Sequence, residues 1–496
     1  MIGTAARHYL TVGESLPIPE HVDWSAAPPA HKLYRGLPRT RLGYDDPLGR
    51  LCADAYRISR LRWTSPGALR RVIGTRGAAV PDGRAAVSTL RPVPSGGARF
   101  PGELYVVTGP SAGVPPGVHY YDAAHHGLVT LRPGDHRPSV AAAVGGSPCR
   151  WPAVTFLLSL RFGKNAFKYG ELCYRLGALD VGVLLGQILE AARGEAVVRF
   201  QFVDDELDTL LGLDPDRESV LAAMTVGAEK PITAPADSGS DGVAGSSGYR
   251  CDWALSELPA PSAVHRASRY RSTRAFRRLR PDAADRNARG GAGATVALPD
   301  AAVDLPRAVP VRRSSMGYFV PRTLPAAGLA GLLRAATKGY PSDVDDRRGA
   351  LRGTVLYCVV NNVDGVPAGI HRYDPDRHAL VEIRPGDVGV ELQRTLTVNL
   401  FNLSHTGVCL YPVGCYDVGL DAFGDRWYRM QNMEAGIVTQ RVYLAAAAMG
   451  LRCHANLGYD VARTNRLLGL APDRTALIHL MVGAGREPGD YYELPC

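Results

Sequence analysis

Lysine is rare in this chain, and one lysine stands beside a tyrosine and a glycine. The five lysines are Lys32, Lys164, Lys168, Lys230 and Lys338. The third lies in Phe167-Lys168-Tyr169-Gly170. An amine and a phenol both have unperturbed pKa values of about 10, so each needs surroundings that lower this value before it can act as a base at neutral pH. Lys168 and Tyr169 are therefore candidate functional residues, and the sequence does not decide which of them could act as a base.

Two further motifs could hold an anionic or polar ligand. In Pro94-Ser95-Gly96-Gly97, the two glycines allow close approach of a ligand to the backbone, and the hydroxyl and amide groups could bind phosphate or a polar ring edge. Arg312-Arg313-Ser314 offers two guanidinium groups and a hydroxyl, which would suit a phosphate. An ordinary turn and an exposed basic linker end are the alternatives for these two motifs.

His119 and His371 could be taken for metal ligands. They occur at matched places in two similar blocks, which favours a shared structural contact, and no metal site is predicted. The nine cysteines are an odd number without a CxxC pair, as expected for reduced thiols in a cytoplasmic protein.

These motifs lie in a chain that repeats itself. The block Gly117–Asp122 returns as Gly369–Asp374, and Tyr174-Arg175 returns as Tyr428-Arg429, displaced by 252 and 254 residues. Such an interval indicates two copies of one domain, which can pack together as a covalent dimer. The sequence predicts an N-terminal domain at 1–230, a linker rich in small and polar residues at 231–308, and a C-terminal domain at 309–496.

Each copy contains the pattern of a buried helix after its Tyr-Arg pair. Apolar residues recur at helical spacing from Leu176 to Ile188 and from Met430 to Val442, and Gly450 is a candidate helix cap. Strands are predicted at 103–107 and 355–360, with closing strands at 221–227 and 477–483. Helices and strands without strict alternation favour an α+β fold for both copies.

Composition argues against two classes of partner. The net charge of +9 comes almost wholly from scattered arginines, so we expect no nucleic-acid partner. No uncharged apolar stretch reaches about 18 residues, so we expect no membrane span and a soluble, cytoplasmic protein.

Taken together, the motifs resemble the nitroreductase superfamily and, more narrowly, its SagB-type azoline dehydrogenases. The resemblance rests on the Arg-Arg-Ser opening, the Pro-Ser-Gly-Gly loop, the Gly-x-His-x-Tyr-Asp block and the Lys-Tyr-Gly…Tyr-Arg…Glu-Ala-Gly helix. It implies domains that dimerise and bind FMN at their interface. It also implies that Lys168 and Tyr169 match the family's catalytic pair, and that Asn456 and Gly458 match a loop beside the flavin.

The family's cofactor motifs are divided between the two copies. Pro94, Ser95, Gly96 and Gly97 stand in the first copy, whereas Arg312, Arg313 and Ser314 stand in the second. Where a glycine loop would be expected, the second copy has only Tyr340-Pro341-Ser342-Asp343. The resemblance thus implies one composite FMN site within an intrachain pseudo-dimer.

The implied activity is oxidation of azolines (thiazoline or oxazoline) to azoles in a ribosomally made precursor peptide, with a cyclodehydratase as the expected partner. Two alternatives remain open at this point. The chain could be a nicotinamide-dependent nitro or quinone reductase of the same superfamily, or a flavin-free scaffold that binds peptides or partner enzymes.

Overall fold

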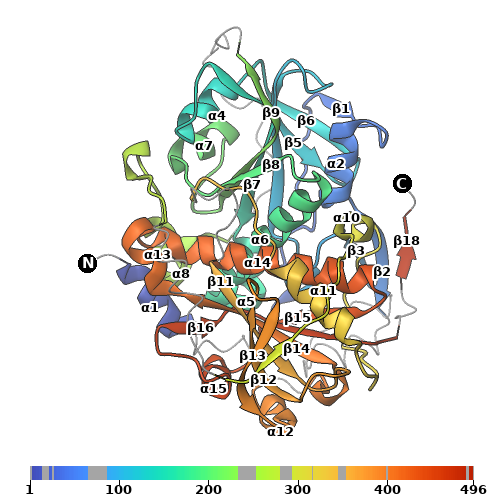
Figure 1. The fold of residues 1–496 in the computed structure, drawn as a ribbon. Helices are drawn as coiled ribbons and strands as arrows, with labels where there is room; N and C mark the ends of the chain where they lie inside the picture. The colour runs from blue at the N-terminus through green and yellow to red at the C-terminus, as the bar shows by residue number, and fades with distance from the viewer. Residues whose placement is uncertain are drawn as a thin grey trace.

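The computed structural model of the protein describes residues 3–13, 22–24, 27–64, 86–232, 253–279, 293–315, 317–344, 353–397, 400–486 and 491–494. Two β-sheets lie at opposite ends of the molecule, and long helices lie between them (Figure 1).

The first sheet is built from the N-terminal copy and is antiparallel throughout. Its strands follow the order β1-β6-β5-β4-β7-β9-β8. Their bounds are β1 Arg39–Arg41, β4 Gly102–Thr108, β5 Gly117–Asp122, β6 Gly127–Pro133, β7 Arg150–Arg161, β8 Ala196–Arg199 and β9 Glu218–Pro231. The predicted strands at 103–107 and 221–227 are confirmed as β4 and β9.

The second sheet has the same topology. Its order is β10-β13-β12-β11-β14-β17-β15, with β16 also paired to β14. The bounds are β10 Thr295–Ala297, β11 Thr354–Val360, β12 Gly369–Asp374, β13 Ala379–Pro385, β14 Val408–Cys415, β15 Arg452–Asn456, β16 Arg474–Ala476 and β17 His479–Gly483. The pairing register shifts just before His119 in one sheet and just before His371 in the other, so even an irregularity is duplicated.

Helices α6 (Cys173–Ala191) and α14 (Arg426–Ala448) join the two halves at the centre of the molecule (Figure 1). They are the predicted core helices, and α14 is followed by the expected left-handed Gly450. A Cβ atom at Gly182 would overlap the backbone oxygen of Met433, and one at Gly436 would overlap that of Leu179. The helix backbones therefore touch at two glycines that correspond in the duplication.

Side chains repeat this symmetry around the helix crossing. Tyr174 and Tyr428 stack with ring centroids 6.3 Å apart, and Gln440 Nε2 donates to Gln187 Oε1. Tyr174 and Tyr428 correspond in the duplication, whereas Gln187 and Gln440 lie one residue off the corresponding positions. The predicted α+β pseudo-dimer of two tandem domains is thus confirmed.

The other helices surround this centre. Their bounds are α1 Thr4–Gly13, α2 Pro47–Tyr56, α4 Arg137–Ala143, α5 Gly163–Tyr169, α7 Asp204–Leu211, α8 Pro259–Ala267, α10 Leu305–Ala308, α11 Ala326–Ala336, α12 Gly389–Gln393, α13 Tyr416–Phe423 and α15 Val461–Leu467. Helix α2 packs on α6 as α11 packs on α14. A small sheet of β2 (Arg60–Thr64), β3 (Ala86–Leu90) and β18 (Tyr491–Glu493) brings the C-terminal segment onto the first copy.

The described part of the predicted linker at 231–308 contains regular structure. Strand β10 pairs with β13, helix α8 contains a buried Val264, and α10 buries Leu305. The low apolar content hid these elements because a short edge strand and a short helix need few apolar residues. Residues 233–252 and 280–292 of that segment lie outside the described residues.

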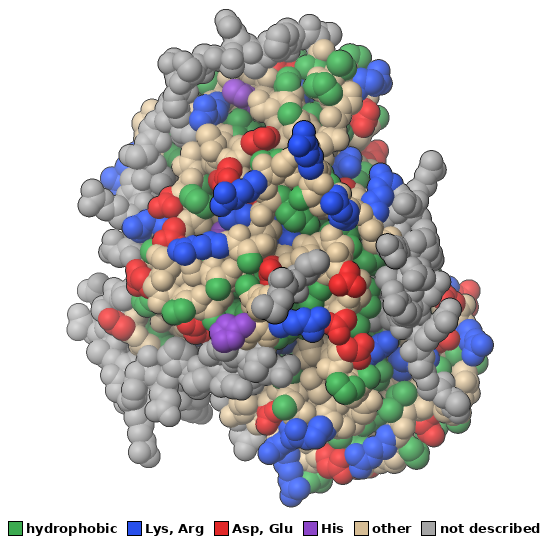
Figure 2. Space-filling view, turned by 90° about the vertical axis from the view of Figure 1, so that its left-hand side faces the viewer, with side chains coloured by type: hydrophobic (Ala, Val, Ile, Leu, Met, Phe, Trp, Pro, Cys, Tyr) green, Lys and Arg blue, Asp and Glu red, His purple; other side chains and the backbone are tan. Residues whose placement is uncertain are grey.

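Two features concern the nucleic-acid and membrane classes of partner: the distribution of charge on the surface and the burial of the longest apolar helical stretch. On the face drawn in Figure 2, Lys and Arg side chains are spread over the surface with Asp and Glu among them. Within the described residues, one helical stretch, Gly163–Ala191, is long and apolar enough to cross a membrane, and 94% of its most apolar 18 residues are buried inside the protein.

Candidate functional site

Lys168 and Tyr169 are the last two residues of α5. One turn earlier, the fully buried Lys164 donates hydrogen bonds of 2.8 Å to the backbone oxygens of Ala30 and Phe100. Phe100 follows the predicted glycine loop, so Lys164 ties α5 to that loop. The end of the helix is thereby held where Lys168 and Tyr169 meet the loop.

The loop contacts both candidate catalytic side chains. Pro94 and Ser95 lead into a turn of 3-10 helix at Gly96–Ala98, in which Gly97 has φ +58°. A Cβ atom built on Gly97 would lie 2.5 Å from Tyr169 Oη and 2.6 Å from Lys168 Nζ. A side chain at this position is disfavoured both by the backbone conformation and by the space. The structure therefore brings Gly97, Lys168 and Tyr169 together.

The surroundings shift the pKa values of Lys168 and Tyr169 in opposite directions. Burial and the nearby Arg99 guanidinium lower the pKa of Lys168 from its usual value to about 8. Burial and the Asp180 carboxyl raise the pKa of Tyr169, against a smaller opposing effect of Arg99. Near neutral pH, an appreciable fraction of Lys168 is thus the free amine, while Tyr169 keeps its proton. The pair offers one base and one hydrogen-bond donor.

Asp180 on α6 lies behind the loop and was not singled out by the sequence. Ser95 Oγ donates to its Oδ2 at 2.7 Å, and the backbone amide of Gly96 lies 3.4 Å from its Oδ1. Burial raises the pKa of Asp180 to about 7, against the lowering effects of the Ser95 and Gly96 hydrogen bonds. Its place in the duplicated Asp-Val-Gly and Glu-Ala-Gly blocks was the available signal.

The second copy reaches this loop through Arg312. The side chain is buried, and its Nε donates to the backbone oxygen of Pro92 at 2.5 Å. One of its terminal nitrogens lies 3.4 Å from Ser314 Oγ. Arg313 instead forms an ion pair with Glu493 of β18. Arg312 and Ser314 therefore lie at the junction with the loop of the first copy, and Arg313 turns toward the C-terminal strand.

Tyr443 of α14 links this junction to Asn456. Ser314 Oγ donates to Tyr443 Oη at 3.3 Å, and Tyr443 Oη accepts from the amide of Ala455 at 2.8 Å. Asn456 ends β15, and its Oδ1 accepts from the amide of Gly458 at 2.8 Å. A chain of contacts thus runs from Ala455, the neighbour of Asn456, through Tyr443, Ser314 and Arg312 to Pro92, two residues before the Pro94–Gly97 loop. Tyr443 lies in the core stripe of α14, so the contacts of its hydroxyl were not predicted from the sequence.

These residues fit the expected flavin cofactor. Arg312 and Ser314 provide a cationic and a hydroxyl donor suited to a phosphate, whereas Arg313 is paired with Glu493. Gly97 leaves its backbone free of a side chain, and Lys168 and Tyr169 place an amine and a phenol beside it. The donors come from both copies, as a site between two subunits requires.

The corresponding place around β8 is filled by the chain itself. Val198 of β8 pairs with Ser342, whereas Cys453 of β15 pairs with Ser314. The carboxylate of Asp343 accepts the backbone amides of Phe200 and Gln201 at 2.9 Å each. The predicted remnant at Tyr340–Asp343 is therefore a plug that uses the amides on that side.

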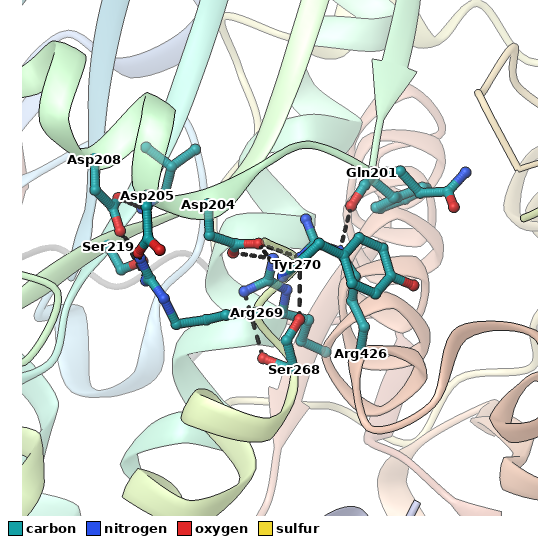
Figure 3. Close-up of polar contacts among 12 residues, drawn as sticks. Gln201, Asp204, Asp205, Asp208, Ser219, Ser268, Arg269, Tyr270 and Arg426 are labelled. Atoms are coloured by element: carbon teal, nitrogen blue, oxygen red, sulfur yellow. Dashed lines mark hydrogen bonds and ion pairs between the residues drawn. The ribbon is translucent and has the colours of Figure 1, made fainter. Parts of the chain in front are cut away.

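A buried ion cluster lies next to Phe200, and Figure 3 shows its contacts around Asp204 and Arg426. Arg426 and Arg429 of α14 bind the two carboxylate oxygens of Asp204 at 2.6 and 2.7 Å, and all three side chains are fully buried. The amide of Tyr270, in the predicted linker, also donates to Asp204. Burial alone would raise the pKa of Asp204, but the two guanidinium groups hold it below its usual value.

The two repeated histidines make the same structural contact. The Nε2 atoms of His119 and His371 lie 3.1 and 3.0 Å from the backbone oxygens of Pro115 and Pro367, four residues before each histidine. Among the described residues, no group of three or more His, Cys, Asp and Glu could hold a metal ion.

Comparisons with known proteins agree with this arrangement. Residues 312–485 match the family model described as the Nitroreductase family, so this part of the chain is a nitroreductase-family domain. A crystal structure from Anabaena variabilis, provisionally named a nitroreductase, aligns with 97% of this chain and 99% of its own at a TM-score of 0.74 and 19% identity. The nitroreductase fold thus extends over both copies.

Two curated relatives match shorter stretches. A protein of Methanocaldococcus jannaschii, provisionally named a nitroreductase, is 35% identical over 103 residues, or 21% of this chain and 52% of its own length. The trifolitoxin-processing protein TfxB of Rhizobium leguminosarum bv. trifolii is 33% identical over 149 residues, or 27% of this chain and 38% of its own. The chain therefore spans about half or less of the curated relatives that it matches.

Proposed function

We propose that this chain is an FMN-dependent oxidoreductase that converts azoline rings of a precursor peptide into azoles. The observation that carries the proposal is the meeting of Lys168 and Tyr169 with the backbone of Gly97. The nitroreductase-family domain supports oxidoreductase chemistry. A relative named for trifolitoxin processing supports a role in natural product maturation.

The reaction removes a proton and a hydride from adjacent carbons of the azoline ring. When bound, FMN would supply the hydride acceptor. The protein must bind and orient the ring, exclude water and take the proton. Arg312, Arg313, Ser314 and the loop Pro94–Gly97 would hold the cofactor, and Asn456 and Gly458 would lie beside its ring system.

Lys168 is the base in this proposal. Its lowered pKa leaves roughly a tenth of the amine free at pH 7 and about half at pH 8. That amine accepts the ring proton and becomes an ammonium ion. Tyr169, whose phenol stays protonated, donates a hydrogen bond that orients the substrate.

The partners are proposed on chemical grounds. Azoline rings arise when a cyclodehydratase closes a cysteine or serine side chain onto the preceding backbone carbonyl. The substrate would therefore be a peptide delivered by such an enzyme. A pseudo-dimer with one site would process one ring at a time.

The test uses the full chain loaded with FMN and an azoline-containing peptide. Wild-type protein should remove two hydrogens per ring, detected by mass spectrometry. Lys168→Met and Tyr169→Phe should both retain flavin absorbance. Lys168→Met should lose at least about a hundredfold in rate, the usual worth of a general base, and Tyr169→Phe, which removes a hydrogen-bond donor, should lose less. Normal rates in both variants would overturn the assignment.

The same preparation separates the two rival functions. A nitro or quinone reductase would show rapid bleaching of the flavin by a nicotinamide cofactor and no dependence on Lys168. A flavin-free scaffold would stay colourless after incubation with FMN and desalting.

A further inference from the structure

Asp180 and Glu434 correspond in the duplication, and each binds the segment that leads into the central strand of its own sheet. Asp180 binds Ser95 Oγ and the amide of Gly96, ahead of β4. Glu434 accepts the amides of Gly353 and Thr354 at 2.5 and 3.2 Å, at the start of β11. It also accepts the hydroxyl of Tyr340 at 3.0 Å.

Asp180 and Glu434 each bind the segment before a central strand, but different groups surround the two carboxyls. Burial raises the pKa of both to about 7. Lys164 of α5 lowers the pKa of Asp180, while Asp180 raises the pKa of Tyr169. Glu434 instead faces Tyr340 and Arg441. Only Asp180 thus acts on the loop that contacts Lys168 and Tyr169.

The loop needs such a support because its backbone is strained. Gly97, Ala98 and Phe100 all have φ between 49° and 58°, a region that residues other than glycine rarely adopt. The hydroxyl of Ser95 donates to Asp180 and accepts the amide of Phe100 at 2.8 Å, closing the loop. Without the carboxyl, the hydroxyl loses its acceptor and the strained turn can relax.

We propose that Asp180 is a positioning residue that holds the Ser95–Phe100 loop in its strained form against Lys168 and Tyr169. The inference deepens the proposed function and rests on it for the effect on FMN. The contact of the loop with the two side chains belongs to the chain itself and can be measured without cofactor.

The first readout is backbone hydrogen exchange in the flavin-free full chain. Asp180→Ala should speed exchange of the Gly96 and Phe100 amides, and Asp180→Glu should restore much of the protection. The matched control, Glu434→Ala, should speed exchange at Gly353 and Thr354 and leave the loop unchanged. Unchanged exchange of Gly96 and Phe100 in Asp180→Ala would overturn the inference. If this variant does not fold, Asp180→Asn, which keeps one acceptor oxygen, replaces it.

The second readout is FMN affinity, with kcat and KM for the peptide. Asp180→Ala should weaken FMN binding about tenfold, the worth of one hydrogen bond to a charged group, and lower kcat more than it changes KM. Glu434→Ala should keep wild-type affinity. If the wild-type chain binds FMN and the two variants bind it with equal affinity, the role of Asp180 is wrong and the proposed function still stands. Absence of FMN binding by the wild-type chain would sink both this role and the proposed function.

Discussion

At the level of single residues, the proposed chemistry depends on a lysine that can lose its proton near neutral pH. Lys168 has this property because it is largely desolvated and stands near Arg99. Burial and Asp180 raise the pKa of Tyr169, its neighbour in the chain. The same buried setting thus separates an acid from a base.

The pH dependence of the reaction follows from this shift. A base with a pKa of about 8 is protonated and inactive at lower pH, so kcat should rise with pH and level off above about 8. The measurement is kcat of the FMN-saturated enzyme across this range. A flat profile in the wild-type protein would exclude Lys168 as the base.

Gly97 offers a second test at this scale. Alanine there would strain the backbone by about 1–2 kcal/mol and push Tyr169 and Lys168 apart. We expect Gly97→Ala to lose most of its kcat. Gly113→Ala is the matched control, because Gly113 has φ +80° and open space around it. It should lose similar stability in urea and keep full activity.

Site residues of unusual type or spacing were predictable from the sequence. Lys168 stood out because lysine is rare, and Gly97 because glycines cluster there. Asp180, Tyr443 and Asp343 were not recognised as contact residues. Each works through partners that are far away in the chain, such as Ser95 for Asp180 and Phe200 for Asp343. No local spacing reveals such contacts.

At the level of elements, helices α6 and α14 hold the two halves in register. Their closest approach requires that Gly182 and Gly436 lack side chains. The site depends on this approach because its loop and α5 come from one copy and Arg312 from the other.

A methyl group at the crossing should therefore separate the halves. Gly182→Ala would place a Cβ inside the backbone of α14, and we expect a loss of about 3 kcal/mol or more in the free energy of unfolding. Gly328→Ala is the control, since it adds a methyl to α11 where the nearest atom is 3.3 Å away. It should be neutral or slightly stabilising. Equal unfolding midpoints in urea for the two variants would contradict the close approach of the helices.

Elements with strong periodicity were predictable, and weakly patterned ones were not. The helical spacing of apolar residues predicted α6 and α14, and short apolar runs predicted β4, β9 and β11. Strand β10 and helix α10 escaped because their stability comes from pairing with β13 and packing on α14. The glycine contacts at the crossing needed the relative position of both copies.

At the level of the whole molecule, the duplication yields two related interfaces between the copies, and these interfaces make different contacts. One joins Arg312 to the Pro92–Gly97 segment. The other is closed by Asp343, the Asp204 ion cluster and the segment around Tyr270. The two interfaces therefore differ in their contacts, and Lys168 and Tyr169 lie only beside the first of them.

We expect the plug to contribute to the free energy of unfolding through Asp343. Asp343→Ala would leave the buried amides of Phe200 and Gln201 without their acceptor, at a cost of about 1–3 kcal/mol in the free energy of unfolding. Asp300→Ala, which removes an exposed partner of Arg334, should change it by less than about 1 kcal/mol. Denaturant titration of both variants measures the difference. Equal midpoints would contradict the role of Asp343.

The amount of FMN bound per chain tests the composite site most directly. The purified full chain is saturated with FMN, desalted, and heated to release the cofactor, which is then measured against the protein concentration. The proposed composite site, whose donors are divided between the two copies, predicts one FMN per chain. Two FMN per chain, or none, would contradict it.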